Sequence, residues 1–317
     1  MIGCGKVAEV KSGPALQQAR GSKLVAVMRR SGREAADFAA RHSVPRWYDS
    51  AEALIADPEV DAVYVATPPD THESYACRVA AAGKPAYVEK PMARTAAECE
   101  RMVAAFTRAR VPLFVAYYRR RLPRFLAIEE WLTGKLLGTV TGVSYRMARP
   151  KHQVDGGWRT RPEVAGGGYF MDVGCHVLDL LDFLFGPLQG ATGLATNVAS
   201  PYAAEDSVVM SFRLSTGALG TAAFNFASAI HDDTLRITGT EGEIIASVFG
   251  DEPVRLCRTS GVTQLVRPNP RHIQLPLIES VVADLLRQGQ CPSTGRSAAR
   301  TATVMDAALA SFYAGAA

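Results

Sequence analysis

The sequence predicts an α/β protein in which a parallel sheet comes first and a mostly antiparallel sheet follows. Up to residue 119, short apolar stretches alternate with helical segments, which is the order of βαβ units in a parallel sheet. From residue 189 to 266, short strands are separated by Gly, Asn and Asp, a pattern typical of consecutive antiparallel strands. A chain of 317 residues is long enough for two domains, so we expect one over residues 1–119 and a second over residues 120–317.

The composition is that of an ordinary globular protein and excludes several classes of partner. The chain is 48% apolar and 21% charged, with a net charge of +4. It has no polybasic run, so neither a nucleic acid nor a membrane is an expected partner. The six cysteines are scattered and never form C-x-x-C, which favours reduced thiols in the cytoplasm and no metal site. No secretory segment and no long apolar run is present in the sequence.

The first motif is a glycine loop near the start of the chain. Residues 3–8 read G-x-G-x-x-A and precede a helical stretch that contains Ala15. Glycines suit a tight turn whose backbone approaches a pyrophosphate at a helix N-terminus. We therefore predict cofactor contacts at Gly3, Gly5, Lys6 and Val7. The motif should follow a strand, but only two residues precede it, so either the first strand is nearly missing or the true start lies upstream.

The next strand, Leu24–Val27, bears on the choice of cofactor. A site for NAD would place an acid at its end to bind the ribose 2′-hydroxyl. The chain instead continues Met28-Arg29-Arg30-Ser31, and arginine forks suit a 2′-phosphate. Cofactor contacts are therefore predicted at Arg29, Arg30 and Ser31, with NADP preferred and NAD possible. The alternative to a phosphate site is that these residues form a basic loop exposed to solvent.

Two more strands end in residues suited to a ligand. The strand 60–66 leads into a loop with Thr67, Pro68 and His72, which we predict to contact the cofactor. Ala86–Val88 then ends in Glu89, Lys90 and Pro91, and open α/β sheets bind ligands at the carboxyl ends of their strands. A surface Glu–Lys pair is the alternative. The intervening helices are expected at 33–42, 51–56, 73–82 and 96–108, and the strand 112–118 ends at Arg119.

The C-terminal half carries a second group of candidate residues. A helix at 125–133 and a strand at 140–146 precede a loop with Trp158 and Arg159, and a triple glycine at 166–168 precedes Asp172 and His176. With helical spacing, Asp172 and His176 project from one face. A lone helical histidine is more often structural than catalytic, and Asp172 could cap or pair. Helices at 277–288 and 298–314 end the chain, and the last of them could pack back on the first domain.

The combination of these motifs in this order resembles the Gfo/Idh/MocA family of NAD(P)-dependent oxidoreductases. The resemblance covers essentially the whole chain and is most specific at Glu89-Lys90-Pro91 and Asp172…His176. Within the family, the sequence is most similar to sugar-type and dihydrodiol-type dehydrogenases and to 1,5-anhydrofructose reductases. The resemblance implies a doubly wound Rossmann domain, a C-terminal domain with an open-faced sheet, and a nicotinamide between the domains.

The resemblance also assigns roles to residues. Lys90, Asp172 and His176 match the family's catalytic lysine, aspartate and histidine, and the cofactor residues extend to Glu89. The chemistry agrees with this assignment, because hydride transfer at a carbinol carbon needs a proton relay at its oxygen, and histidine titrates near neutrality. Residues expected to contact a sugar-like or cyclic polyol substrate are Lys90, Arg119, Trp158, Arg159, Asp172 and His176.

Two other functions remain open at this point, a glycosidase that uses nicotinamide transiently without net redox change and a non-catalytic cofactor-binding regulator. Retention of Lys90, Asp172 and His176 argues against the regulator. The family's open sheet leaves an apolar face uncovered, so we expect a homodimer or a homotetramer.

Overall fold

A computed structural model describes residues 1–150 and 157–314 of the chain. The chain forms two compact units, residues 1–118 with 270–299 and residues 119–269 with 300–317. The chain therefore returns to the first unit for thirty residues, a return that a single boundary after residue 119 does not include. Among the described residues, no helix is long and apolar enough to span a membrane.

The first unit is built on short parallel strands. Strand β1 (Ala26–Met28) pairs with β2 (Arg46–Tyr48), and β3 (Val63–Val65), β4 (Ala86–Val88) and β5 (Leu113–Val115) pair in that order. Ile2 forms parallel bridges to both Met28 and Val65, so it joins the two groups of strands. Strands β1, β3, β4 and β5 are buried at every residue, as expected for a parallel sheet that is covered on both faces. The predicted doubly wound parallel sheet is confirmed.

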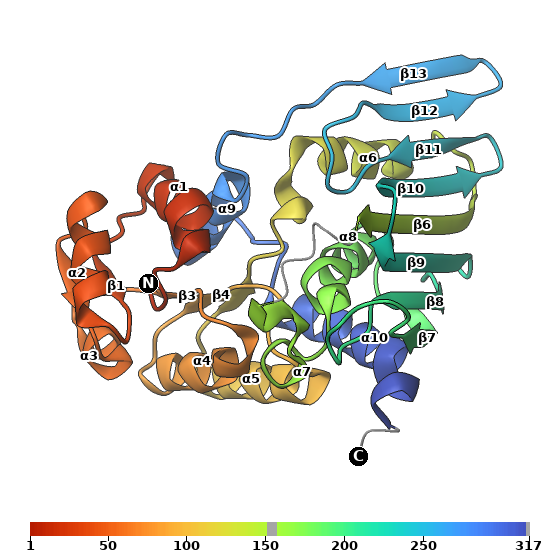
Figure 1. Cartoon of the computed structure of the whole chain (residues 1–317). Helices are drawn as coiled ribbons and strands as arrows, with labels where there is room; N and C mark the ends of the chain where they lie inside the picture. The colour runs from red at the N-terminus through yellow and green to blue at the C-terminus, as the bar shows by residue number, and fades with distance from the viewer. Residues whose placement is uncertain (151–156, 315–317) are drawn as a thin grey trace. The chain divides into compact units, whose positions relative to one another are not determined.

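Helices cover both faces of this sheet, with α4 and α5 on one side of β3 and β4 and α1 and α9 on the other (Figure 1). Ser31, Ser50 and Thr95 each cap a helix by accepting a hydrogen bond from a backbone N–H three residues later. The helical segments are η1 (Ala8–Ser12), α1 (Gly13–Gln18), α2 (Gly32–Arg41), α3 (Ala51–Ala56), η2 (Pro69–Thr71), α4 (His72–Ala81), α5 (Ala96–Ala109) and α9 (Leu275–Leu285).

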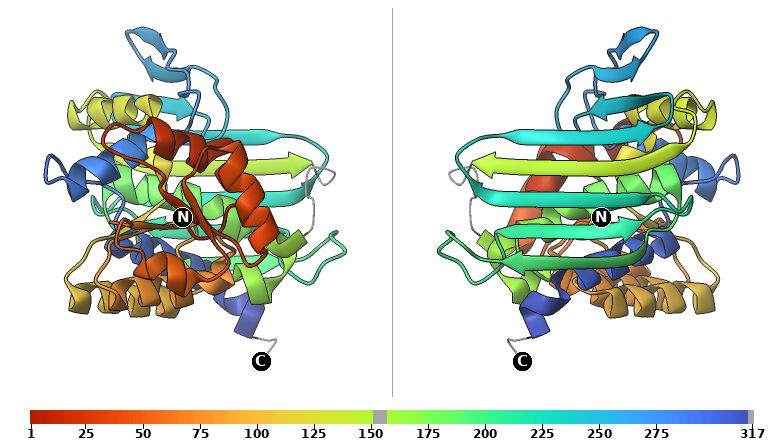
Figure 2. Two further views of the ribbon diagram at one scale, coloured as in Figure 1. Left: turned by 90° about the vertical axis from the view of Figure 1, so that its left-hand side faces the viewer. Right: turned by 90° about the vertical axis from the view of Figure 1, so that its right-hand side faces the viewer.

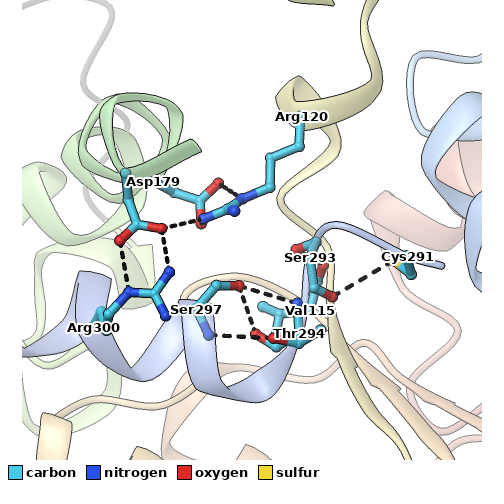
Figure 3. Close-up of polar contacts among 9 residues, drawn as sticks. Val115, Arg120, Asp179, Cys291, Ser293, Thr294, Ser297 and Arg300 are labelled. Atoms are coloured by element: carbon cyan, nitrogen blue, oxygen red, sulfur yellow. Dashed lines mark hydrogen bonds and ion pairs between the residues drawn. The ribbon is translucent and has the colours of Figure 1, made fainter. Parts of the chain in front are cut away.

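The returning segment is attached to the end of β5. Ser293 Oγ donates to the carbonyl oxygen of Val115 at 2.7 Å, and Val115 N donates to the Ser293 carbonyl at 3.2 Å (Figure 3). A few residues later begins α10 (Gly295–Tyr313), whose first turn belongs to the first unit and whose remainder belongs to the second.

An apolar cavity of about 670 Å³ lies within the first unit at the amino ends of its strands. It is lined by residues 24–26 at the start of β1, residues 59–64 at the start of β3, and apolar side chains of α9 such as Ile278. Met1 also lines it, and the Met1 amino group donates to the Ala26 carbonyl at 2.7 Å. The cavity is at the opposite edge of the sheet from Gly3 and Lys90, so it is separate from the predicted cofactor site.

The second unit contains an eight-stranded sheet in the order β13-β12-β11-β10-β6-β9-β8-β7. All neighbours are antiparallel except β6 and β9, so the predicted mostly antiparallel sheet is confirmed. In β8 and β9, buried residues alternate with more exposed ones, as in a sheet with one covered face. The strands are β6 (Val140–Pro150), β7 (Gln189–Thr196), β8 (Ser207–Arg213), β9 (Leu219–Ser228), β10 (Asp232–Gly239), β11 (Gly242–Ala246), β12 (Val254–Arg258) and β13 (Gly261–Leu265).

The helices described in this unit lie against one face of the sheet. In Figure 1, α6 and α8 lie on the same side of β6 and β9, and the right-hand view of Figure 2 shows the other face without a helix of this unit in front of it. The helical segments are η3 (Tyr118–Arg121), α6 (Pro123–Thr133), η5 (Gly157–Thr160), α7 (Pro162–Ala165), η6 (Phe170–Gly174) and α8 (Cys175–Phe185).

A buried ionic network holds α8 in place. Arg120 donates to both carboxylate oxygens of Asp179 at 2.8 and 2.7 Å and to Asp182 at 3.0 Å, and Arg300 donates to Asp182 at 2.8 and 2.7 Å. Figure 3 shows both guanidinium groups directed at carboxylates on α8. Burial raises the pKa of Asp179 to about 6, and the adjacent Arg120 acts in the opposite direction. The network fixes the helix that carries His176.

Candidate active site

The glycine loop directly follows Ile2, which forms parallel bridges to β1 and β3. Gly3 has a φ of +90°, and a Cβ at this position would lie 2.8 Å from the Ala66 carbonyl oxygen, so only glycine fits. A Cβ at Gly5 would meet no atom within 4 Å, so its backbone faces open space. The chain is helical from Lys6 onward, with Lys6 exposed and Val7 half-buried. An open backbone at a helix start fits a pyrophosphate group.

Lys90 lies at the same edge of the sheet, directly after β4. Glu89 N donates to the Val65 carbonyl at 2.8 Å, and Ala66 N donates to the Ile2 carbonyl at 2.8 Å. The strand tips that carry Gly3 and Lys90 are thus connected through residues 65–66. Lys90 is half-buried, and the Lys90–Pro91 peptide bond is cis.

Glu89 is buried and supports this strand tip. Its carboxylate accepts hydrogen bonds from the Tyr64 hydroxyl at 2.6 Å, the Gln274 side-chain amide at 2.8 Å and the Lys90 backbone N–H at 3.1 Å. Burial raises the pKa of the Tyr64 hydroxyl well above its ordinary value, and the Glu89 charge acts in the same direction. Glu89 therefore orients the backbone that carries Lys90, while its predicted cofactor contact stays a prediction.

His72 braces two of the predicted cofactor loops. Its imidazole is fully buried, with Nε2 2.7 Å from the Thr67 carbonyl oxygen and Nδ1 3.0 Å from the Pro91 carbonyl oxygen. Burial lowers the pKa of His72, and the carbonyl oxygens around the ring oppose this effect. His72 thus ties the loop with Thr67 and the exposed Pro68 to the loop after Lys90. Its predicted direct contact with the cofactor stays a prediction.

The basic residues after β1 have partners of their own. Arg29 forms an ion pair with Glu34 at 3.0 Å, in which both side chains are about half-exposed. Ser31 Oγ accepts from Glu34 N at 3.4 Å and caps α2, and Arg30 is exposed. All three lie ahead of a helix N-terminus, which favours a negatively charged group.

Asp172 and His176 lie in the second unit, where the predicted regular helix is wrong in its first turn. Asp172 belongs to the π-helical segment η6, and His176 is in the first turn of α8. A π-helix has a wider turn than an α-helix, so the four-residue spacing does not by itself place both side chains on one face. A Cβ at Gly174 would lie 2.6 Å from the Phe170 ring, so the tight packing here needs glycine. His176 is 4% exposed and Asp172 is half-buried.

A buried carboxylate anchors the chain ahead of this segment. Both oxygens of Glu205 accept from Gly168 N, at 2.8 and 2.9 Å, and one of them accepts from the Tyr313 hydroxyl at 2.7 Å. Burial raises the pKa of Glu205. The triple glycine is thus a point at which the backbone packs closely against the chain just ahead of β8, since a Cβ at Gly168 would lie 2.5 Å from the Glu205 carbonyl oxygen.

The structure connects the predicted substrate residues in two groups. Arg159 Nε donates to Asp172 at 3.1 Å, and its guanidinium lies 4.4 Å from the Trp158 ring centroid. Arg119 is 4% exposed, donates to the Val248 carbonyl at 3.1 Å, and lies 4.1 Å from the Phe249 ring centroid. Phe249 in turn meets the His176 ring at a centroid distance of 6.0 Å. The loop that carries Trp158 and Arg159 includes residues 151–156, which lie outside the described residues.

Comparison with known proteins places the chain in a family. Residues 1–117 match the GFO_IDH_MocA model, described as an oxidoreductase family with an NAD-binding Rossmann fold, and residues 125–245 match the GFO/IDH/MocA C-terminal domain. The chain is also 36% identical over 311 residues to "Oxidoreductase P35" of Formosa agariphila, covering 96% of each chain. It belongs to the Gfo/Idh/MocA family of oxidoreductases.

More distant relatives have named activities. The chain is 27% identical over 286 residues to the 1,5-anhydro-D-fructose reductase of Ensifer adhaerens, covering 88% of this chain and 85% of the relative. A solved structure of levoglucosan dehydrogenase in complex with NADH and levoglucosan superposes with a TM-score of 0.89 at 20% identity, covering 98% of this chain and 95% of that one. At that identity, the structural match shows the fold alone.

In this Gfo/Idh/MocA protein, sequence reasoning missed the residues that support the site. A polar partner near Tyr64 could have been predicted from the sequence. Tyr64 and Tyr87 occupy paired positions in neighbouring buried strands, and buried hydroxyl groups need hydrogen-bond partners. Gln274, Glu205 and Phe249 carry no local signal, because each reaches the site from a distant part of the chain. Among the described residues, no cluster of three or more metal-ligating side chains is present.

Proposed function

We propose that this oxidoreductase transfers a hydride between a nicotinamide cofactor and a carbinol or carbonyl carbon of a sugar-like or cyclic polyol substrate. The observation that carries the proposal is the shared sheet edge of the first unit, where the open backbone at Gly5 and the side chain of Lys90 follow neighbouring strand positions. The relatives named as an anhydrofructose reductase and a levoglucosan dehydrogenase support the substrate class. Bound nicotinamide supplies the hydride chemistry.

The protein's own residues handle the proton. Lys90 donates a hydrogen bond to the substrate oxygen and stabilises its alkoxide character. His176 takes up or returns the proton of that oxygen. Asp172, which is held by Arg159, orients the substrate hydroxyl groups. Gly3, Gly5, Lys6 and Val7 receive the pyrophosphate, and the loop with Thr67 and Pro68 forms a stiff wall next to it.

The experiment is a panel of sugars, polyols and dihydrodiols with both cofactors, using nicotinamide that carries deuterium at the transferred position. We expect deuterium in the product and stoichiometric change of the nicotinamide absorbance. Turnover of a glycoside without net change in absorbance would support the glycosidase alternative instead. Deuterium that never appears at a carbinol carbon of any reduced product across the panel would refute the proposal.

For the cofactor, we propose a preference for NADP(H) over NAD(H). The support is the absence of an acid at the end of β1 and the presence of Arg29, Arg30 and Ser31 ahead of α2. A charge-assisted hydrogen bond contributes about 1.5–3 kcal/mol, which corresponds to roughly a tenfold to hundredfold preference. Dissociation constants for both cofactors should be measured in wild type, Arg29→Ala, Arg30→Ala and the double variant. Equal affinities in wild type, or a double variant that keeps its preference, would contradict this assignment.

We further propose that the protein is a homodimer or homotetramer that associates through the uncovered face of the eight-stranded sheet (Figure 2). Leu194, Val209 and Leu219 are 75%, 57% and 63% exposed on β7, β8 and β9. Exposed apolar groups on neighbouring strands favour an interface. Sedimentation at micromolar concentration should show the oligomer, and Val209→Glu should shift it toward monomer. A wild type that is only monomeric would contradict the proposal.

A further inference from the structure

A rigid turn in the second unit presents an aromatic ring to His176. The turn, residues 247–250, follows β11, and the Asp233 carboxylate accepts from the backbone N–H groups of Val248, Phe249 and Gly250 at 3.1, 2.6 and 3.2 Å. The same carboxylate accepts from the hydroxyls of Ser247 and Tyr145. Phe249 is nevertheless only half-buried. A ring held by so many hydrogen bonds at its own backbone and left partly exposed is suited to contact a ligand.

Two guanidinium groups lie over this ring. The Cζ atoms of Arg119 and Arg149 are 4.1 and 5.5 Å from the Phe249 centroid, and the His176 ring meets Phe249 edge-on at 6.0 Å. We call Phe249, Arg119, Arg149 and His176 the Phe249 cluster. Within residues 1–150 and 157–314, the Arg149 side chain forms no hydrogen bond or ion pair, although the residue is half-buried at the end of β6. Two positive charges near one ring repel each other, so an anion between them would be stabilised.

The neighbouring carboxylates do not serve as that anion. Asp233 is directed at the N–H groups of the turn, and Asp172 forms its ion pair with Arg159 at 3.1 Å. Arg124, a third guanidinium near the turn, donates to the carbonyl oxygens of Gly250 and Glu252, the latter at 2.7 Å. Asp251 and Glu252 also lie near the turn, with Asp251 3.9 Å from Arg124, so the charges around the turn largely cancel. Among the described residues, Arg149 is nevertheless a guanidinium next to His176 that has no carboxylate partner.

We infer that the Phe249 cluster binds the carboxylate of an acidic sugar or polyol, so that the substrate of this enzyme is a polyhydroxylated carboxylate. The inference rests on the proposed function and narrows its substrate class. Arginine forks match the two oxygens of a carboxylate. A phosphate group is commonly held by backbone N–H groups, but those of the turn already bind Asp233. The 6.0 Å between the His176 and Phe249 rings is on the scale of one hexose, so one molecule can reach both.

The experiment compares matched ligands with the cofactor-loaded enzyme. Dissociation constants are measured by calorimetry for D-glucose, D-galactose and D-xylose, for the corresponding uronates and aldonates, and for glucose 6-phosphate. Because a charge-assisted hydrogen bond is involved, we expect at least one carboxylate to bind about 10- to 100-fold more tightly than its neutral counterpart. Tighter binding of the phosphate than of every carboxylate, or no carboxylate binding below about 10 mM, which corresponds to less than ~3 kcal/mol, would overturn the inference.

Arg149→Gln and Arg146→Gln are the matched variants, since both arginines lie on β6 and Arg146 pairs with Asp232 on the exposed face. Arg149→Gln should remove the preference for carboxylates and change neutral-sugar binding less than about twofold, because it removes one charge-assisted contact. Arg146→Gln should change neither. An unchanged preference in Arg149→Gln would refute the cluster. Carboxylate binding without deuterium transfer from nicotinamide would instead refute the proposed function and leave the binding site intact.

Discussion

Lys90 and His176 reach their positions by two different routes. Lys90 follows a three-residue buried strand, and its neighbours along the sheet edge come from the next strands in the same parallel sheet. His176 follows a π-helical segment, and the groups that fix its surroundings come from Glu205, Asp233 and α10. A strand tip is thus positioned mainly by regular pairing, whereas the helix start depends on single buried carboxylates far away in sequence.

The largest expected effect concerns the chemistry, which should be equally sensitive in both regions. Lys90→Ala and His176→Ala should each lower kcat by about two to four powers of ten, the range for a positioned acid–base group. Cofactor affinity should fall less in His176→Ala than in Lys90→Ala. Exposed Lys23→Ala and His231→Ala are the controls and should retain wild-type turnover. Normal kcat in either active-site variant would assign that residue a purely structural role.

The second prediction tests whether the surroundings of His176 depend on a single distant carboxylate more than the strand tip at Lys90 does. Asp233→Ala removes hydrogen bonds to three backbone N–H groups and two hydroxyls, so the free energy of unfolding should fall by about 2–4 kcal/mol. Its neighbour Asp232, which pairs with the exposed Arg146, is the control, and Asp232→Ala should cost at most about 1 kcal/mol. Urea unfolding followed by hydrogen exchange in β11 measures both. Equal effects would show that the turn does not rely on Asp233.

The third prediction concerns the first unit, whose weak point is the cavity at the other edge of its sheet. Four added residues ahead of Met1, with alternating valines, would extend the strand position of Ile2 into the apolar cavity. Burial of two valines contributes about 3–6 kcal/mol, and ordering the segment offsets much of it, so we expect a net gain of about 1–3 kcal/mol. A Gly-Ser extension of equal length is the control and should give no gain.

The same valine extension also tests how the free energy of unfolding depends on pH. Burial lowers the pKa of the Met1 amino group from 8.0 to about 5, so the folded state releases a proton that the unfolded state keeps between these values. This contribution to stability is complete above pH 8 and is lost as the pH falls toward 5. The valine extension replaces the amino group by an amide, and the slope of unfolding free energy with pH over this window should decrease. An unchanged slope would assign it to other groups.

The same contrast explains which parts of the fold and of the candidate site can be predicted from the sequence. The alternation of strands and helices, the glycine loop and Glu89-Lys90-Pro91 are local patterns, and the parallel sheet they predict is confirmed. The antiparallel strands were also readable from their turns. The π-helical turn at Asp172 was not, because it depends on how Gly168 packs against Glu205, and neither was Phe249, whose position depends on Asp233. Long-range hydrogen bonds between single residues leave no periodicity in the sequence.

The smallest expected effect separates two roles of Ser31. Its oxygen accepts from Glu34 N at the start of α2, which leaves the hydroxyl proton free to donate to a 2′-phosphate. Ser31→Ala should therefore cost about 0.5–2 kcal/mol of stability as a lost cap. It should also weaken NADPH binding about tenfold, the lower end for a lost hydrogen bond to a charged phosphate. Ser50, which caps α3 in the same way, is the matched control, and Ser50→Ala should lose stability with no change in either cofactor's affinity. Ser31→Asp sharpens the test, because aspartate retains the cap but repels a phosphate, so stability should recover while NADPH binding weakens and NADH binding does not. If Ser31→Ala lowers the affinities for NADPH and NADH by the same factor, the hydroxyl acts only through the helix, and the basic loop after β1 loses one of its three proposed phosphate contacts.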